Sequence, residues 1–164
     1  MKKIHYSDSQ IKGLVHDIIR AMLVDGWRPD YIVGLTRGGL VAANMISQYL
    51  DIPLECLKVS LRDSEHGPES NLWMAEDAFG GKKILVVDDI NDSGATLNWI
   101  RQDWPSGCIP ADKRWETIWG DNVRFAVLVD NQASKFHEID YAGVEINKAE
   151  DDSWIVFPWE EWWK

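Results

Sequence analysis

The sequence is poor in cysteine and contains no long apolar run. Its two cysteines, Cys56 and Cys108, lie far apart and match no zinc-binding or redox spacing. We expect free thiols, which agree with a reducing compartment. No apolar stretch is long enough to span a bilayer, and residues 1–5 lack the apolar core of a signal peptide. These absences predict a cytoplasmic protein without a membrane partner.

Positive charge is also scarce: the chain has 17 lysines and arginines but 27 acidic residues, which gives a net charge of -10. Binding to a phosphate backbone requires a basic face, so we expect no nucleic-acid partner. A small substrate that carries several phosphates is compatible with this charge only under one condition. Its site must be built locally from backbone N–H groups, an arginine and a magnesium ion.

The 164 residues are 45% hydrophobic, which predicts a single globular domain over 1–164. Tryptophan is abundant, with ten residues, and four of them lie close to the C-terminus: Trp154, Trp159, Trp162 and Trp163. Clustered aromatic side chains pack a core or a subunit interface. We therefore predict a homo-oligomer, either a dimer or a tetramer.

Helical and strand patterns alternate along the chain. A capping box at Ser7 and Gln10 precedes a helix whose apolar face includes Leu23, and a second helix is expected from Leu40 to Leu50. Residues 62–81 lack periodicity and are expected to form a long loop, and 105–121 to be mostly connection. Expected strands lie at 31–35, 54–61, 84–87, 124–130 and 141–146. This alternation predicts an α/β fold with a mainly parallel sheet flanked by helices.

The most informative stretch is 84–97. Four apolar, β-favouring residues lead to Asp88-Asp89, and the polar loop from Asp92 to Thr96 then runs into a helix. Ligands in open α/β sheets bind at the carboxyl ends of strands, and a helix N-terminus binds anions. The pattern indicates a phosphate site whose neighbouring acids face sugar hydroxyls, a metal ion or a reacting base. The alternative is a strand with a charged turn and an ordinary helix cap.

A second strand–loop–helix unit contains Thr36-Arg37-Gly38-Gly39. Arg37 would supply a fixed cation for phosphate oxygens, while Gly38 and Gly39 would let the backbone approach closely. Taken alone, the segment is better explained as a plain glycine turn that feeds a helix. Beside the motif at 84–97, the phosphate-binding interpretation becomes the better one.

Three segments together resemble type I phosphoribosyltransferases. Residues 84–97 carry every fixed position of the phosphoribosyl-diphosphate motif: a hydrophobic run, two acids, two residues and Asp-Ser/Thr-Gly-x-Thr. Residues 36–41 resemble the diphosphate loop of the xanthine-guanine enzymes, in which the peptide before the arginine is often cis. Residues 152–160 resemble the purine-specific C-terminal segment, in which Trp-Ile is followed by Pro-Trp and an acid. The alternative is that this segment is a hydrophobic strand that packs on the sheet.

The resemblance implies a type I phosphoribosyltransferase-like fold, with a core at about 1–150 and a small hood from about 62–81 and 151–164. It also implies a transfer of 5-phosphoribosyl from phosphoribosyl diphosphate to a 6-oxopurine (hypoxanthine, guanine or xanthine), as in purine salvage, with Mg2+ as cofactor. The products are the nucleoside 5'-monophosphate and diphosphate. Two alternatives stay open: a sensor or regulator that binds these ligands without catalysis, and a transferase for another base.

By the same resemblance, Asp88 and Asp89 hold the ribose hydroxyls directly or through Mg2+. Arg37, Gly38 and Gly39 contact the diphosphate. The 5'-phosphate lies in the loop formed by Asp92, Ser93, Gly94, Ala95 and Thr96.

On the base side, the resemblance places the Trp154 ring on the purine and the backbone near Ile155 at the purine edge. Asp92 is the predicted catalytic residue, which exchanges a proton with the imidazole nitrogen. One position departs from the family, because Asn131 stands where a lysine contacts the exocyclic oxygen of the base. Asn131 could donate to that oxygen, or Lys135 could reach it by a shifted register.

Overall fold

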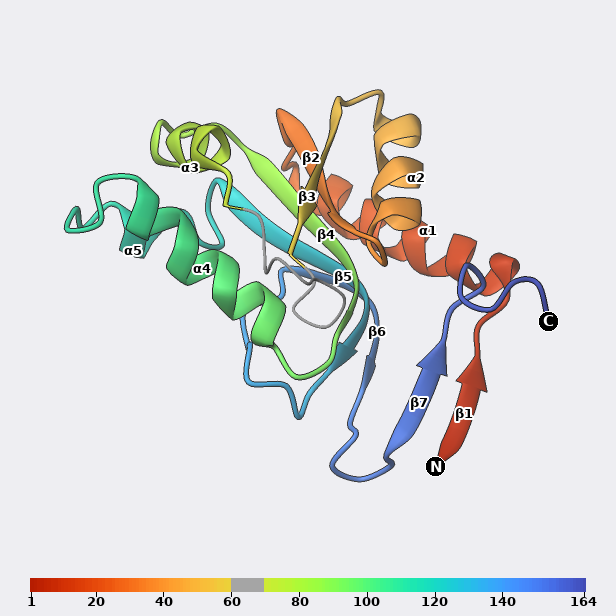
Figure 1. Ribbon diagram of the computed structural model, residues 1–164. Helices are drawn as coiled ribbons and strands as arrows, with labels where there is room; N and C mark the ends of the chain where they lie inside the picture. The colour runs from red at the N-terminus through yellow and green to blue at the C-terminus, as the bar shows by residue number, and fades with distance from the viewer. Residues whose placement is uncertain (60–69) are drawn as a thin grey trace.

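The strands form two parallel sheets. The computed structural model describes residues 1–59 and 70–164, in which a five-stranded sheet has the order β3–β2–β4–β5–β6 and a two-stranded sheet pairs β1 with β7 (Figure 1). The strands are β1 (Lys2–His5), β2 (Tyr31–Thr36), β3 (Leu54–Lys58), β4 (Ile84–Asn91), β5 (Val123–Asn131), β6 (Tyr141–Ile146) and β7 (Ser153–Val156).

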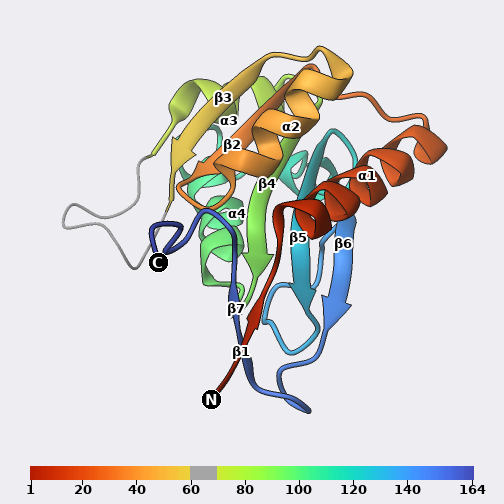
Figure 2. The same ribbon diagram turned by 90° about the vertical axis from the view of Figure 1, so that its right-hand side faces the viewer.

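Helices cover both faces of the larger sheet. Figure 2 shows α1 (Asp8–Asp25) and α2 (Leu40–Leu50) over the face that is turned toward the viewer. The other face carries α3 (Leu72–Phe79), α4 (Ala95–Gly107) and α5 (Trp115–Ile118). The predicted α/β fold with a parallel, doubly covered sheet is therefore confirmed.

Strand β4 shows why the sheet needs two covered faces. Ile84 and Val86 pack into the core beneath α3, α4 and α5, whereas Leu85 and Val87 pack beneath α1 and α2. All four side chains are fully buried. A strand buried on both faces reads as a continuous apolar run, which is how this strand appears in the sequence.

Helix α1 begins with the predicted capping box, in which the Ser7 hydroxyl accepts from Gln10 N and the Gln10 side chain accepts from Ser7 N. Leu23 departs from the prediction, because its side chain is exposed in the last turn of the helix. Within the two described ranges, 1–59 and 70–164, no helix has both the length and the apolar character needed to cross a membrane.

Part of the predicted long loop is helical. Residues 72–79 form α3, which starts at the Asn71 cap and buries Met74, Ala75 and Ala78. A helix of eight residues offers too few apolar positions for its periodicity to stand out in the sequence. The first part of that predicted loop, residues 62–69, lies outside the described residues, and so do the last residues of the expected third strand, 60 and 61.

The segment at 105–121 is also more ordered than predicted. Helix α4 continues past Pro105 to Gly107, and α5 follows. The Trp119 ring lies 6.2 Å from Trp104, 6.0 Å from Trp115 and 5.9 Å from Phe125. Trp104 and Trp115 are therefore core residues, and the partly buried Trp119 packs against that core. The expected connection is thus part of the fold.

The small sheet joins the two ends of the chain. Ile4 pairs with Ile155 and Lys3 with Trp154, and Tyr6 N donates to Val156 O at 3.0 Å. The sequence-based division placed the first residues in the core and 151–164 in the hood. In the structure, residues 2–5 pair with the C-terminal segment. This contact joins two four-residue strands that lie far apart in the sequence, so no local pattern could reveal it.

Deletion of residues 2–5 tests this coupling. We expect β7 to lose its backbone partners and the free energy of unfolding to fall by about 1–3 kcal/mol, as for a few lost hydrogen bonds. Hydrogen exchange should accelerate at Ile155, which pairs in β7, while amides of the central strand β5 serve as an internal control within the native state. Unchanged protection of Ile155 would contradict the coupling.

Candidate active site

The candidate site lies where the strand order reverses. β2 and β4 are neighbours, and the chain continues outward to β3 on one side and to β5 on the other. Open α/β sheets bind ligands outside the carboxyl ends of the strands at this switch point. A cavity of about 720 Å³ occupies the position. The loops that follow β2 and β4 therefore line the same cavity.

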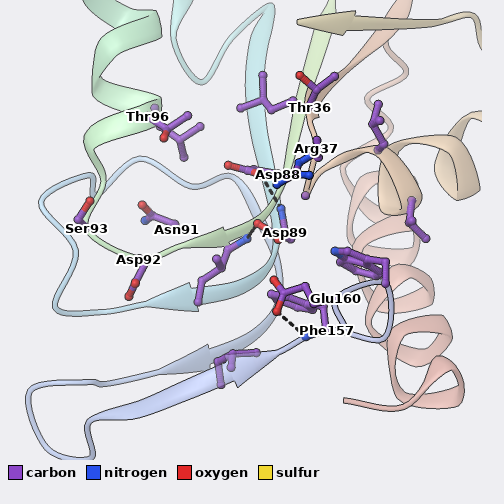
Figure 3. Close-up of a pocket in the computed structure, with 18 of the residues that line it drawn as sticks. Thr36, Arg37, Asp88, Asp89, Asn91, Asp92, Ser93, Thr96, Phe157 and Glu160 are labelled. Carbon is purple, nitrogen blue, oxygen red and sulfur yellow. Dashed lines mark hydrogen bonds between the residues drawn. The ribbon is translucent and has the colours of Figure 1, made fainter. Parts of the chain in front are cut away.

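Most of the predicted site residues line this cavity. They are Arg37, Gly38, Asp88, Asp89, Asp92, Ser93, Gly94, Ala95, Thr96, Trp154 and Ile155. Gly39 and Asn131 are not among the lining residues. Figure 3 shows Arg37 beside the two acids at the ends of the strands, with Ser93 and Thr96 farther along at the start of α4.

The loop that leads into α4 has the form of an anion site. Ser93 Oγ accepts from Ala95 N at 3.3 Å, and the first helical turn closes when Asn98 N donates to Gly94 O at 3.0 Å. The free N–H groups of a first helical turn and nearby hydroxyls attract a phosphate. The predicted loop-to-helix arrangement is therefore present in the structure.

A buried network of hydrogen bonds supports the loop at 92–96. The Asn91 side chain donates to Asp130 Oδ1 at 2.9 Å and to Phe136 O at 3.0 Å, and it accepts from Ser134 Oγ at 2.8 Å. In addition, Lys135 N donates to Ser93 O at 3.0 Å. Sequence reasoning missed Asn91 and Ser134, because no spacing in the chain links a strand end to a loop more than 40 residues away.

Gly94 is required by both conformation and space. Its φ is +90°, a left-handed conformation that side chains rarely adopt, and a Cβ there would lie 2.5 Å from Phe136 N and 2.7 Å from Ser134 Oγ. The loop and the polar network therefore lie so close together at this position that there is no room for a side chain.

The acid pair is partly buried at the end of β4. Asp89 N donates to Asp88 Oδ1 at 2.9 Å, and Ile90 N donates to Asp89 Oδ1 at 2.8 Å. Burial raises the pKa of the Asp88 carboxyl well above its usual range, and the Asp89 charge raises it further. A cation at this position would offset both effects. Two carboxylates beside a phosphate site fit Mg2+, which commonly combines one or two carboxylates with substrate phosphates.

The glycine pair after β2 allows the two loops to meet. A Cβ at Gly38 would collide with the Asp89 carboxylate, and one at Gly39 would collide with the carbonyl oxygen of Val87. Gly39 thus packs against β4 rather than lining the cavity. The Thr36–Arg37 peptide is cis, as the resemblance suggested.

The C-terminal segment closes the other side of the cavity. Trp154 is 40% exposed while Ile155 is buried, so the ring of Trp154 is accessible to a planar ligand. The Phe157 and Trp159 rings stack with their centroids 4.9 Å apart, and this contact stabilises the C-terminal segment. Glu160 also lines the cavity, and burial raises the pKa of its carboxyl, with the Asp89 charge contributing.

Asn131 stands at the end of β5, but it is not among the residues that line the cavity. Its side chain is 5% exposed and fully engaged: Nδ2 donates to Asp92 O at 2.9 Å, while Oδ1 accepts from Ala133 N at 3.1 Å and from Lys148 N at 3.0 Å. It therefore braces the site instead of facing a ligand. The Lys135 side chain is exposed and is not among the lining residues, which removes the shifted-register alternative.

Lys148 is a lining residue that sequence reasoning missed. It lies in the turn after β6, and its Nζ is 2.9 Å from Asp92 Oδ1. In the sequence it stands between two expected strands without any motif around it, so only the folded arrangement reveals its place.

Comparison with protein families gives one assignment for almost the whole chain. The model of the phosphoribosyl transferase domain matches residues 2–164. This protein belongs to the phosphoribosyl transferase domain family, as the three sequence segments suggested.

Similar proteins within the family act on purines according to their names. The chain is 32% identical over 170 residues to a xanthine-guanine phosphoribosyltransferase of Cereibacter sphaeroides, covering 97% of this chain and 87% of the relative. The structure is similar to a purine phosphoribosyltransferase from Pyrococcus horikoshii, with a TM-score of 0.67, 25% identity, and coverage of 98% and 96% of the two chains. A Helicobacter pylori xanthine-guanine-hypoxanthine phosphoribosyltransferase shares the fold, with a TM-score of 0.65, 21% identity, and coverage of 97% and 93%.

Gly94→Ala tests the close approach of the loop to its support. We expect the free energy of unfolding to fall by about 1–3 kcal/mol, because a left-handed residue gains a Cβ against backbone. Chemical denaturation measures the change. The matched control is Gly13→Ala in α1, where a Cβ would meet nothing within 4 Å. There alanine should stabilise the helix by up to about 1 kcal/mol. Equal effects at both sites would contradict this account.

Proposed function

We propose that this protein is a purine phosphoribosyltransferase that transfers 5-phosphoribosyl from phosphoribosyl diphosphate to a 6-oxopurine and releases diphosphate. The observation that carries the proposal is the convergence of four features on one cavity: the loop at 92–96, the acid pair, Arg37 and Trp154. The names of the similar proteins support the same substrates.

The 5'-phosphate and the diphosphate of the donor bind at separate places in this proposal. The 5'-phosphate binds the N–H groups of 92–96 and the hydroxyls of Ser93 and Thr96. The diphosphate lies at Arg37 and the glycine turn, and Asp88 and Asp89 take the ribose hydroxyls. The transition state should resemble an oxocarbenium ion, so the chain acts mainly by positioning the reactants and stabilising charge.

Asp88 and Asp89 would also hold Mg2+, so that they take the ribose hydroxyls either directly or through the ion. When bound, the ion supplies positive charge that neutralises the leaving diphosphate. The role of the protein is to keep the two carboxylates beside the glycine turn, where Gly38 leaves room for the Asp89 side chain.

On the base side, Trp154 stacks on the purine and the backbone near Ile155 contacts its edge. Asp92 exchanges a proton with the imidazole nitrogen. Its carboxylate lies on this side of the cavity, because it faces Lys148, which in turn lies over the Trp154 ring.

A cytoplasmic location and a homo-oligomer complete the proposal. Both cysteines are free thiols, as expected of a reducing compartment. Trp162 and Trp163 are largely exposed, as expected of aromatic residues that a second copy covers.

The proposed function is tested by a product assay with phosphoribosyl diphosphate against hypoxanthine, guanine, xanthine, adenine and orotate. We expect nucleotide from 6-oxopurines, and we expect a chelator to abolish turnover and added Mg2+ to restore it. Product from adenine or orotate alone would overturn the base assignment. Tight binding of phosphoribosyl diphosphate without any product would move the protein to the sensor class.

Asp92→Asn tests the catalytic assignment. Loss of the proton-transfer group should lower kcat by roughly 100-fold or more, while the KM for phosphoribosyl diphosphate stays within about twofold. Steady-state kinetics with hypoxanthine measures both values. Asp17→Asn, at an exposed position of α1, is the matched control and should behave like the wild type. Wild-type turnover in Asp92→Asn would show that another group handles the proton.

A further inference from the structure

A lysine ammonium group lies at the base side of the cavity. Lys148 Nζ is 2.9 Å from Asp92 Oδ1 and 5.7 Å from the centroid of the Trp154 ring. Its side chain is only 13% exposed, and Lys148 is one of the residues that line the cavity. The cation therefore touches both side chains that the proposed function assigns to the purine.

The backbone of Lys148 is held by the residue that also holds Asp92. Asn131 Oδ1 accepts from Lys148 N at 3.0 Å, and Asn131 Nδ2 donates to Asp92 O at 2.9 Å. The turn itself is braced where Ala149 N donates to Asn147 Oδ1 at 3.0 Å. One buried amide thus fixes the lysine and the carboxylate relative to each other, which limits the conformational entropy that ordering them on ligand binding would cost.

The chemistry of an ammonium group restricts what can lie beside it. Lysine offers three N–H donors and no acceptor. A flat base on the accessible Trp154 ring would present one edge toward Nζ. A carbonyl oxygen on that edge gains a charge-assisted hydrogen bond, whereas an amino group would place donor against donor. Sites of this kind discriminate strongly, since the mismatched ligand leaves a buried polar group without a partner.

We propose that Lys148 is the specificity-determining residue of the base site. Its Nζ donates to a carbonyl oxygen of the base stacked on Trp154, and its ion pair keeps the Asp92 carboxylate at the ring nitrogen. The inference rests on the proposed function and names the part of the site that selects a 6-oxo over a 6-amino purine. The cation comes from the turn after β6, not from position 131 or 135.

The test compares Lys148→Met, Lys148→Arg and a matched control, Lys135→Met, which removes an exposed lysine outside the cavity lining. In Lys148→Met, kcat/KM for hypoxanthine should fall about 100-fold, and its ratio to kcat/KM for adenine should fall at least tenfold. The KM for phosphoribosyl diphosphate should stay within about twofold. Lys148→Arg should retain the preference for hypoxanthine, and Lys135→Met should match the wild type.

A binding measurement separates failure of this inference from failure of the proposed function. Inosine and adenosine 5'-monophosphates are titrated against each variant with tryptophan fluorescence as the readout. If the wild type makes no product but prefers inosine monophosphate, and Lys148→Met loses that preference, the activity is wrong and the selectivity assignment holds. If Lys148→Met keeps the wild-type preference in both assays, or loses activity equally for all bases with a lower melting temperature, Lys148 only stabilises the loop and the inference is overturned.

Discussion

The site depends on the parallel pairing of β2 and β4 at the point where the strand order reverses. Two adjacent parallel strands send their loops out from the same edge, so the loops compete for space. Glycine at positions 38 and 39 resolves that competition, because any Cβ there would meet Asp89 or the end of β4. The loop at 36–39 and the acid pair therefore lie in contact, and the pairing of two strands fixes their separation more firmly than flexible loops could.

A second constraint comes from buried amides at the next strand ends. Asn91 connects β4 to Asp130, Ser134 and Phe136, and Asn131 connects β5 to Asp92 and to the turn after β6. Buried polar groups must be hydrogen-bonded, so each amide specifies one arrangement of its partners. Together they extend the rigid part of the site from the loop at 92–96 to the turn after β6. Asn91 also lines the cavity, whereas Asn131 does not.

The sequence predicts the fold, and most of the site residues that it singles out line the cavity, because the signals are local. Strand 84–87 is a continuous apolar run, and the loop from Asp92 to Thr96 is one uninterrupted motif. The features that the sequence did not reveal arise either from long-range contacts or from a helix too short to show a period. The β1–β7 pairing joins the two ends of the chain, α3 has too few buried positions to show a period, and Lys148 reaches Asp92 across more than 50 residues. Asn131 shows the limit of aligning one strand. The alignment placed this residue correctly at the end of β5, but only the fold shows that its amide is buried and hydrogen-bonded within the protein.

The charge of the cavity explains how an acidic protein can accommodate a polyanion. Among the residues that the structure describes, the acids Asp88, Asp89, Asp92, Glu160 and Glu161 line the cavity together with the cations Arg37 and Lys148. Such a site repels a diphosphate unless some acids are neutralised, and burial already raises the pKa of both Asp88 and Glu160. A substrate that arrives with its own divalent counterion would relieve the remaining repulsion while the acids serve as ligands. Lys148 is paired with Asp92 near the Trp154 ring, whereas Arg37 lies beside the acid pair (Figure 3), so the two cations stand at different parts of the cavity.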